Sequence, residues 1–455
     1  MKLHRLSGVF LSAALVLSLL AGCSGGAASS SGSSSAETSQ NSSKGETVTL
    51  RIWGGVPPEA GPQKSIDNFN EAFKDKGIQA EYERFVNDDT GNLKLETSLL
   101  SGNDVDVYLT YTPAILQKRA SGNMALDLSE LIARDSFDVK GIFGEMAEAY
   151  FIDGKPYSIP SKLDQYGIVL NKDMFDDAGI EIPTEWTFDE FREIAKKLTK
   201  GEGQDKVYGM FWNSQQDLLY PFNYLSAQTL GGDPLYTADG KANLSDPVNV
   251  RSINLVNDMM NADKTSPTHT DSVTQKLSQE GMFLTGKSAM TVGPWIVRSI
   301  KDTTQYPHDF VTAFAPYPVA EKGQRQYTQG GYGDFLCINP KSQNLDAAWE
   351  YVKWYSTEGM LPVVAGGRVP AANTYSAEDV ANAFLSGSET LFDLESTKNV
   401  LITPATNYAV ATQTNKLPEI NKALQEELEG IYTGNQTVED GLNKAQQRAS
   451  ELLGN

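Results

Sequence analysis

The chain has 455 residues, of which 40% are hydrophobic and 21% charged, and its formal net charge is −20. This acidic balance argues against a nucleic-acid partner and disfavours adsorption on anionic lipid. The length allows two large lobes, and with only two cysteines the fold must depend on hydrophobic cores rather than on disulfides.

The N-terminus has the pattern of an export signal. Lys2 and Arg5 precede a run of apolar residues that ends in the tetrapeptide Leu-Ala-Gly-Cys at 20–23. This tetrapeptide resembles the lipobox of bacterial lipoprotein signals, which implies removal of residues 1–22 and a lipid such as palmitate on Cys23. An ordinary secretory signal with an incidental cysteine is the alternative. Either signal places the mature chain outside the cytoplasm.

Residues 23–45 follow the signal and are rich in Ser, Gly, Ala, Thr, Gln and Asn. Such a segment buries too little apolar surface to offset its ordering entropy, so we expect a flexible tether. No later run of about 18 apolar residues occurs, which predicts no transmembrane helix in the mature chain. We therefore expect a chain held at the extracellular face of the cell membrane by its lipid alone.

The segment after the tether alternates between strand and helix patterns. Apolar residues alternate over 48–53, recur at helical spacing over 66–73 and alternate again over 78–83. A helix over 93–100 and a strand over 104–109 follow. This succession predicts an α/β lobe with a largely parallel sheet.

A second informative stretch follows at 154–199. A turn leads into an extended segment at 154–160, and 166–170 has the composition of a strand. A short helix is expected from Asn171 to Gly179. Thr187-Phe188-Asp189-Glu190 then forms a capping-box pattern at the start of an amphipathic helix.

Four segments carry a family resemblance: GKPYSIP at 154–160, YGIVLNKDMFDDAGIEIPTEWTFDEFREIAKKLT at 166–199, FLTGKSAMTVGPW at 283–295 and DAAWEYV at 346–352. Together they resemble the family 1 extracellular solute-binding proteins of bacterial ABC importers. The resemblance implies an α/β, two-lobed periplasmic-binding-protein-like fold of type II, with a ligand cleft between lobes joined by a multi-strand hinge. It implies three crossings between the lobes, near residues 162–166, 330–335 and 376–385.

Neither lobe is then continuous in sequence. The resemblance implies a first lobe of 46–163 plus 334–377 and a second lobe of 166–330 plus 384–455. It also implies a monomer without cofactor or metal that binds a mono- or oligosaccharide and delivers it to membrane permease subunits. Two alternatives stay open, namely a non-sugar solute and a surface enzyme acting on glycosides.

Sugar recognition needs aromatic faces for the C–H side of the ring and polar groups for its hydroxyls. Tryptophans at strand ends are the first candidates, namely Trp295, whose motif often faces the cleft in the family, and the less distinctive Trp53 and Trp212. Polar candidates lie at the crossings and in one loop of the first lobe: Asp164, Gln165, Tyr332, Asp334 and Arg368. Tyr111 and Tyr220 are weaker candidates.

Each of these residues has a structural alternative. The tryptophans could be core aromatics, and Arg368 could form a surface ion pair. Arg368 is also the one good basic candidate, and an acidic ligand would need more than one basic group. The sequence therefore favours a neutral sugar.

Two patterns that suggest other chemistry are weak. Residues 281–288 match the P-loop pattern G-x-x-x-x-G-K-S, but the preceding residues 273–280 look helical and the following residues look like a strand. The acidic run 87–92 lacks the ligand spacing of a calcium loop, so we expect a turn. No catalytic histidine or metal motif is present, and Cys337 is expected to be a buried thiol in a strand.

Overall fold

The computed structural model describes residues 47–102, 105–293, 296–324, 327–403, 407–409 and 416–454. All of them belong to the unit formed by Glu46–Asn455. The signal, Cys23 and the tether lie outside the described residues. Among the helices within those ranges, none combines the length and the apolar character that crossing a bilayer would require.

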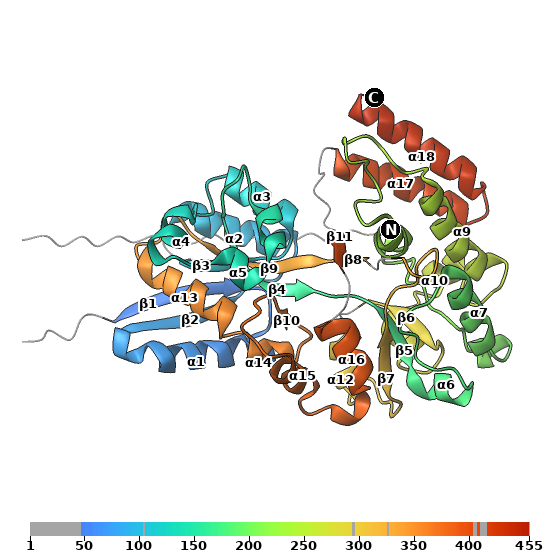
Figure 1. Ribbon diagram of the computed structural model, residues 1–455, viewed down its shortest axis with the longest axis horizontal. Coiled ribbons are helices and arrows are strands. Elements are labelled where there is room, and N and C mark those ends of the chain that lie inside the picture. The colour runs from blue at the N-terminus through green and yellow to red at the C-terminus, as the bar shows by residue number, and fades with distance from the viewer. Residues whose placement is uncertain are drawn as a thin grey trace, which may run out of the picture. The chain divides into compact units, whose positions relative to one another are not determined.

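A six-stranded sheet organises one part of the fold (Figure 1). Its strand order is β10-β4-β9-β3-β1-β2. The strands are β1 (Val48–Gly54), β2 (Ile78–Arg84), β3 (Val107–Thr110), β4 (Ile159–Asp164), β9 (Gly331–Ile338) and β10 (Val369–Pro370).

The pairing in this sheet is mixed. β1 pairs in parallel with both β2 and β3, whereas β9 pairs antiparallel with both β3 and β4. The expected parallel arrangement is therefore confirmed for the first three strands only. The difference arises because β9 comes from a distant part of the chain and inserts between β3 and β4.

Helices flank this sheet as an α/β lobe requires. They are α1 (Pro62–Phe73), α2 (Asp89–Ser101), α3 (Pro113–Ser121), α4 (Ser129–Asp135), α5 (Val139–Phe143), α13 (Leu345–Thr357) and α14 (Leu361–Val364). α1 lies on the opposite side of the sheet from α2 to α5 (Figure 1). The core includes fully buried residues from β1, α1 and β9, among them Ile52, Phe69 and Leu336.

A three-stranded antiparallel sheet organises the other part, in the order β6-β5-β7. Its strands are β5 (Ile168–Asn171), β6 (Met290–Val292) and β7 (Thr312–Ala315). The helices that pack around it are α6 (Lys172–Asp177), α7 (Phe188–Leu198), a π-helical turn (Pro221–Ser226), α8 (Ala227–Leu230), α9 (Pro247–Asn261), α10 (His269–Thr274), α11 (Gln279–Phe283), α12 (Ile296–Lys301), α17 (Leu417–Tyr432) and α18 (Val438–Leu453).

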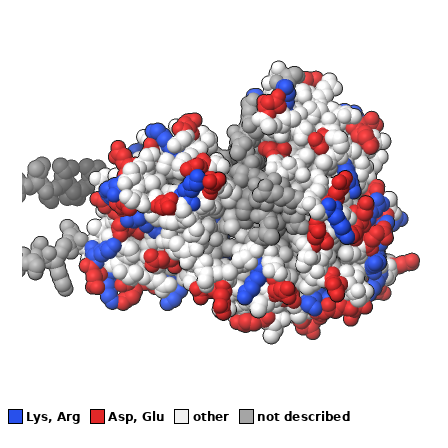
Figure 2. Space-filling view, in the orientation of Figure 1, with Lys and Arg blue, Asp and Glu red and all other residues white. Residues whose placement is uncertain are grey.

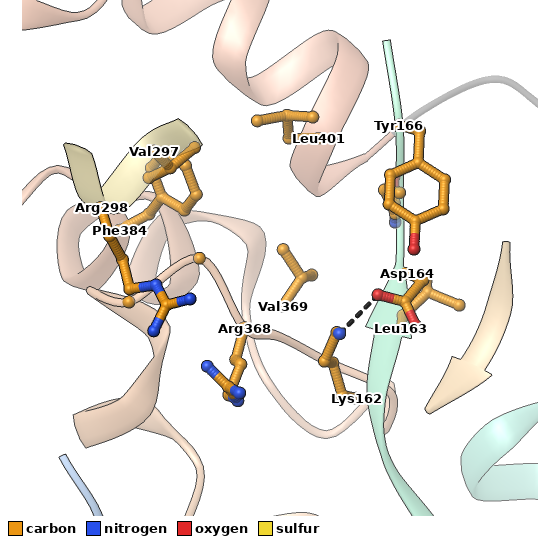
Figure 3. Close-up of a pocket in the computed structure, with 13 residues that line it drawn as sticks. Lys162, Leu163, Asp164, Tyr166, Val297, Arg298, Arg368, Val369, Phe384 and Leu401 are labelled. Atoms are coloured by element: carbon orange, nitrogen blue, oxygen red, sulfur yellow. Dashed lines mark ion pairs between the residues drawn. The ribbon is translucent and has the colours of Figure 1, made fainter. Parts of the chain in front are cut away.

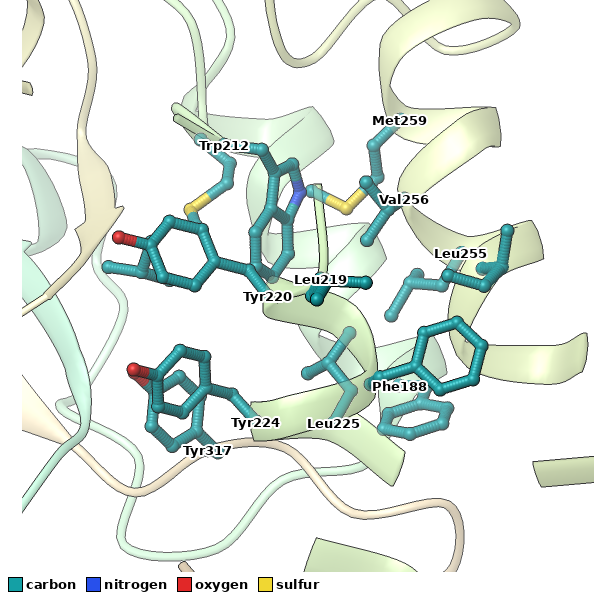
Figure 4. Packing of buried hydrophobic residues seen from close by; sticks show 14 of the residues in the cluster. Phe188, Trp212, Leu219, Tyr220, Tyr224, Leu225, Leu255, Val256, Met259 and Tyr317 are labelled. Atoms are coloured by element: carbon teal, nitrogen blue, oxygen red, sulfur yellow. The ribbon is translucent and has the colours of Figure 1, made fainter. Parts of the chain in front are cut away.

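Two hydrophobic cores support this second sheet. The larger one joins α7, α9 and the π-helical turn through residues such as Phe188, Val256 and Leu225 (Figure 4). The smaller one joins α12, α15 (Ala377–Leu385) and the π-helical segment Lys398–Ile402, which follows α16 (Leu394–Thr397), and it includes Ile296, Phe384 and Leu401.

Two short connections lead out of the six-stranded sheet, one to the three-stranded sheet and one to a separate two-stranded sheet. β4 runs through residues 165–167 into β5, and β8 (Tyr327–Gln329) runs through Gly330 into β9. β8 itself pairs in parallel with β11 (Asn407–Ala409). At the second connection Gly331 has φ +114°, and a Cβ there would lie 2.1 Å from Tyr150 Oη, so only glycine fits.

Several local predictions are confirmed. Thr187 caps α7, and the reciprocal bonds with Glu190 complete the capping box. Cys337 is fully buried in β9. Residues 281–288 do not form a P-loop, as expected, because Gly281 belongs to α11 and the segment leads into β6 rather than into a helix.

Two local predictions are wrong. Residues 87–92 do not form an isolated turn, because the Asp88 side chain accepts a bond from the Gly91 amide and caps α2, which begins at Asp89. The expected helix over 273–280 is also divided. α10 ends at Thr274, and the Ser278 side chain caps a new helix that begins at Gln279.

Candidate functional site: a charged pocket beside the connections between the sheets

A pocket lies where β4 leaves the six-stranded sheet towards β5 (Figure 3). Its cavity has a volume of about 140 Å³ and is open to solvent. It is lined by residues 162–166, by Val297 and Arg298 of α12, by residues 366–369 before and in β10, and by Phe384 and Leu401. Segments that are far apart in sequence therefore meet at this pocket.

The three strands beside the pocket are linked by ion pairs. Lys162 Nζ lies 2.5 Å from Asp164 Oδ1 and 4.0 Å from Asp334 Oδ1. Arg368 Nε donates to Asp334 Oδ2 at 2.8 Å. Because Asp334 is buried, its carboxylate depends on these cations for compensation.

The backbone at Asp334 is unusual. Its φ is +46°, and the ladder between β4 and β9 omits the pairing of Asp334 with Ser161. Ser161 Oγ instead donates to the Asp334 carbonyl oxygen at 2.6 Å. A left-handed conformation in a non-glycine residue is costly and is typical of functional sites.

The pocket contains two arginines with different environments. Burial disfavours the charge of Arg368, but the Asp334 carboxylate more than compensates and raises the pKa of Arg368 above its ordinary value. Partial desolvation and repulsion from Arg368 lower the pKa of Arg298. Arg298 forms no ion pair with any described residue.

Aromatic residues extend from the pocket into the second part of the fold. Tyr166 lines the pocket and meets Tyr224 edge-on, at 5.5 Å between ring centroids. Tyr224 in turn contacts Tyr220 at 5.3 Å and stacks on Tyr317 at 4.9 Å. The three ring hydroxyls of Tyr220, Tyr224 and Tyr317 lie on the same side of the cluster (Figure 4).

The pocket brings together Asp164, Gln165 and Arg368, three of the residues expected from the sequence. Gln165 Oε1 is buried and has no hydrogen-bond partner among the described residues, so the geometry leaves it able to accept a bond. Asp334 supports the pocket through Arg368 without lining it.

Other expected residues lie elsewhere. Trp53 and Trp212 are 3% and 1% exposed and belong to hydrophobic cores. Tyr332 is buried against Tyr150 and donates a hydrogen bond to the Phe143 carbonyl oxygen. These contacts leave the three side chains outside the charged pocket.

Neither Tyr111 nor Tyr220 lines the pocket. The Tyr111 hydroxyl accepts a bond from the Gly55 amide, and burial and the Asp334 charge raise its pKa. Tyr220 belongs to the tyrosine cluster behind Tyr166. Trp295 lies outside the described residues.

Sequence reasoning missed Lys162, Tyr166 and Arg298. Lys162 and Tyr166 flank Asp164 and Gln165, so their proximity to the crossing was a usable signal. Arg298 follows the glycine-proline-tryptophan motif by three residues, and one basic residue in a short helix resembles an ordinary surface charge. No signal in a single sequence links Arg298 to Arg368.

A family model described as "Bacterial extracellular solute-binding protein" matches residues 57–360. The chain belongs to this family. The match covers most of the folded part and includes the connection at 164–168 and strand β9.

Relatives with curated names are distant. A binding protein of Brucella abortus is 25% identical over 282 residues, and the alignment spans 59% of this chain and 65% of that protein's length. The maltotriose-binding protein of Pyrococcus abyssi is 26% identical over 58% of this chain and 53% of its own length. The sn-glycerol-3-phosphate-binding periplasmic protein UgpB of Escherichia coli is 24% identical over 89% of this chain and 92% of its own.

Solved structures show the same architecture. A sugar transporter from Rhizobium etli in an open conformation matches with a TM-score of 0.71 and 24% identity, over 88% of this chain and 99% of its own. The sugar-binding protein MalE from Xanthomonas citri matches with a TM-score of 0.68 and 18% identity, over 90% and 98%. The chain thus has the two-lobed α/β fold of periplasmic binding proteins.

Proposed function

We propose that this protein captures a carbohydrate between two lobes and delivers it to the transmembrane subunits of an ABC importer. The lobes would comprise residues 46–163 plus 334–377 and residues 166–330 plus 384–455. The observation that carries the proposal is the pocket beside the connections between the sheets, which collects polar residues from several distant segments. Family membership supports a solute-binding role.

Capture depends on the relative motion of the two lobes. A ligand that contacts both lobes stabilises the closed state, because only that state makes both sets of contacts. The connections through residues 165–167 and Gly330 would absorb the change in backbone angles. Permease subunits would then receive the ligand from the closed protein.

A sugar ligand is supported by the relatives and by the side chains present. The maltotriose-binding relative and the Rhizobium and Xanthomonas structures carry sugar-related names. Asp164 and Gln165 offer oxygen acceptors to hydroxyl groups, and Arg368 offers a planar donor. We place Trp295 at the cleft as a stacking surface for the sugar ring.

The location follows from the N-terminal signal. Lipid on Cys23 and the tether over residues 24–45 would hold the protein at the extracellular face of the membrane, within reach of its permease. A monomer suffices for this role, because one chain supplies both lobes.

A thermal-shift screen of the mature protein against mono- and oligosaccharides tests the proposal. A ligand that binds the folded protein raises the melting temperature by mass action, and calorimetry then gives its dissociation constant. Chromatography of the same mixtures tests the enzyme alternative. Recovery of unchanged sugar supports binding alone, whereas release of shorter sugars would show glycoside cleavage.

A further inference from the structure

The charges around the pocket do not balance. Three cationic side chains line it, namely Lys162, Arg298 and Arg368. Two carboxylates compensate them, because Lys162 pairs with Asp164 and Arg368 pairs with Asp334. Among the described residues, Arg298 has neither an ion pair nor a hydrogen-bond acceptor, so its solvent-exposed guanidinium is free to bind an anion.

The two arginines also retain donors. Arg368 uses Nε towards Asp334, and none of its η nitrogens donates to a described residue. Figure 3 shows the guanidinium groups of Arg298 and Arg368 on the same side of the pocket. The two arginines come from different segments: Arg298 belongs to α12, and Arg368 directly precedes Val369 of β10. Two such groups can bind an oxyanion through several parallel N–H donors.

We propose that the captured solute carries an oxyanion, either a carboxylate or a phosphate ester, that binds between Arg298 and Arg368. This inference rests on the proposed solute-binding function and narrows its ligand class. With a neutral sugar, Arg298 would lose water as the lobes close and would gain no counter-ion. An oxyanion supplies that counter-ion and satisfies the remaining donors.

The other residues that line the pocket indicate which further groups the ligand contains. Val297, Phe384 and Leu401 form an apolar wall, and Asp164 lies on the other side near Tyr166 (Figure 3). Gln165 also lines the pocket. A hydroxylated carbon skeleton fits this combination of apolar and polar surfaces. A sugar acid, a phosphorylated sugar or a phosphorylated polyol would contact both the two arginines and these apolar and polar surfaces. This proposal departs from the neutral sugar that the sequence favours.

Calorimetry on the mature protein tests the inference with matched ligand sets. The sets are neutral hexoses, the corresponding uronates, and hexose and glycerol phosphates, each titrated at low and at physiological salt. We expect an acidic solute to bind at least about tenfold more tightly than its neutral counterpart. We also expect its affinity to fall as salt is added. Preference for uronates or for phosphates identifies the oxyanion.

The Arg298→Gln variant provides the decisive comparison. It should weaken the acidic solute by about 10- to 100-fold and weaken a neutral analogue much less, because only the oxyanion forms a charged contact with the guanidinium. Arg298→Lys should recover part of the loss. Arg251→Gln is the matched charge control, because Arg251 of α9 lies outside the pocket and its side chain is 42% exposed.

The possible failures are distinguishable. Tight binding of a neutral sugar, with no gain for its acid or phosphate, would overturn the oxyanion inference and leave solute capture intact. Equal losses for neutral and acidic ligands in Arg298→Gln would also overturn it. Absence of binding across every set would overturn the solute-binding proposal together with this inference.

Discussion

Arg368 and Asp334 form an ion pair across strand β4, with 2.8 Å between Arg368 Nε and Asp334 Oδ2. Asp334 belongs to β9 and Arg368 precedes β10, and the sheet order places β4 between those strands. Lys162 of β4 lies 4.0 Å from the same carboxylate. One network therefore ties three neighbouring strands together at the pocket.

Arg368→Gln should destabilise the protein as well as weaken ligand binding. Among the described residues, the substitution leaves the buried Asp334 carboxylate with Lys162 as its only nearby cation, and the expected cost is about 2 kcal/mol. Urea denaturation measures the change. Arg251→Gln is the control, since the ion pair of Arg251 with Asp189 is exposed and should contribute less than about 0.5 kcal/mol. Equal costs for the two variants would contradict this account.

Lys301 should make stability rise with pH in the alkaline range. Burial lowers its pKa from 10.5 to about 8 in the folded protein. Between pH 8 and pH 10.5, Lys301 is protonated in the unfolded chain and largely deprotonated in the folded chain. The free-energy cost of burying its charge is therefore complete below pH 8 and disappears as the pH approaches 10.5.

Urea midpoints measured from pH 7 to pH 10 test this prediction. The wild type should gain stability relative to Lys301→Met as the pH rises. Lys322→Met is the control, because Lys322 is exposed and Glu190 raises its pKa, so this variant should retain the gain. A constant difference between wild type and Lys301→Met would refute the assignment.

The two cysteines should differ in reactivity. Burial raises the pKa of Cys337 to about 11, and its side chain is fully enclosed in β9. A chain that starts at Ser24 should not react with Ellman's reagent when folded at pH 8 and should show one thiol in denaturant. Protein extracted from membranes should also show one, because we propose that lipid occupies the Cys23 thiol. Two thiols in the extracted protein would mean that Cys23 is unmodified.

Substitutions of two tryptophans should separate ligand binding from stability. Trp295→Ala should weaken binding of a proven ligand by at least about tenfold through loss of a stacking surface. Trp212→Phe should lower the melting temperature and leave affinity unchanged, since Trp212 packs at 6.0 Å from Phe191 in the core. Unchanged affinity in Trp295→Ala would remove this residue from the cleft.

Local patterns in the sequence predicted local structure well. The capping box at Thr187 and the alternating strand before Trp53 depend on neighbouring residues alone, and both are confirmed. The prediction of a turn at 87–92 was wrong because an Asp-rich segment suits a turn and a helix N-terminus equally. In the structure the Asp88 side chain caps helix α2.

The pocket was harder to predict because its parts are distant in sequence. Asp164, Gln165 and Arg368 were found through the family resemblance and the expected crossings. Arg298 was missed, since its importance depends on how close it lies to Arg368, which is 70 positions away in the chain. Pairwise charge relationships of this kind arise only when the chain is folded.

The position of β9 also determines when the first sheet can form during synthesis. β9 lies between β3 and β4, yet it begins at Gly331, more than 160 residues after β4 ends at Asp164. Until then β3 and β4 lack their common neighbour, and such long-range pairing is slow. Export through a membrane channel in an unfolded state, as proposed for this chain, would benefit from this delay. The strand order thus favours folding after export over folding inside the cell.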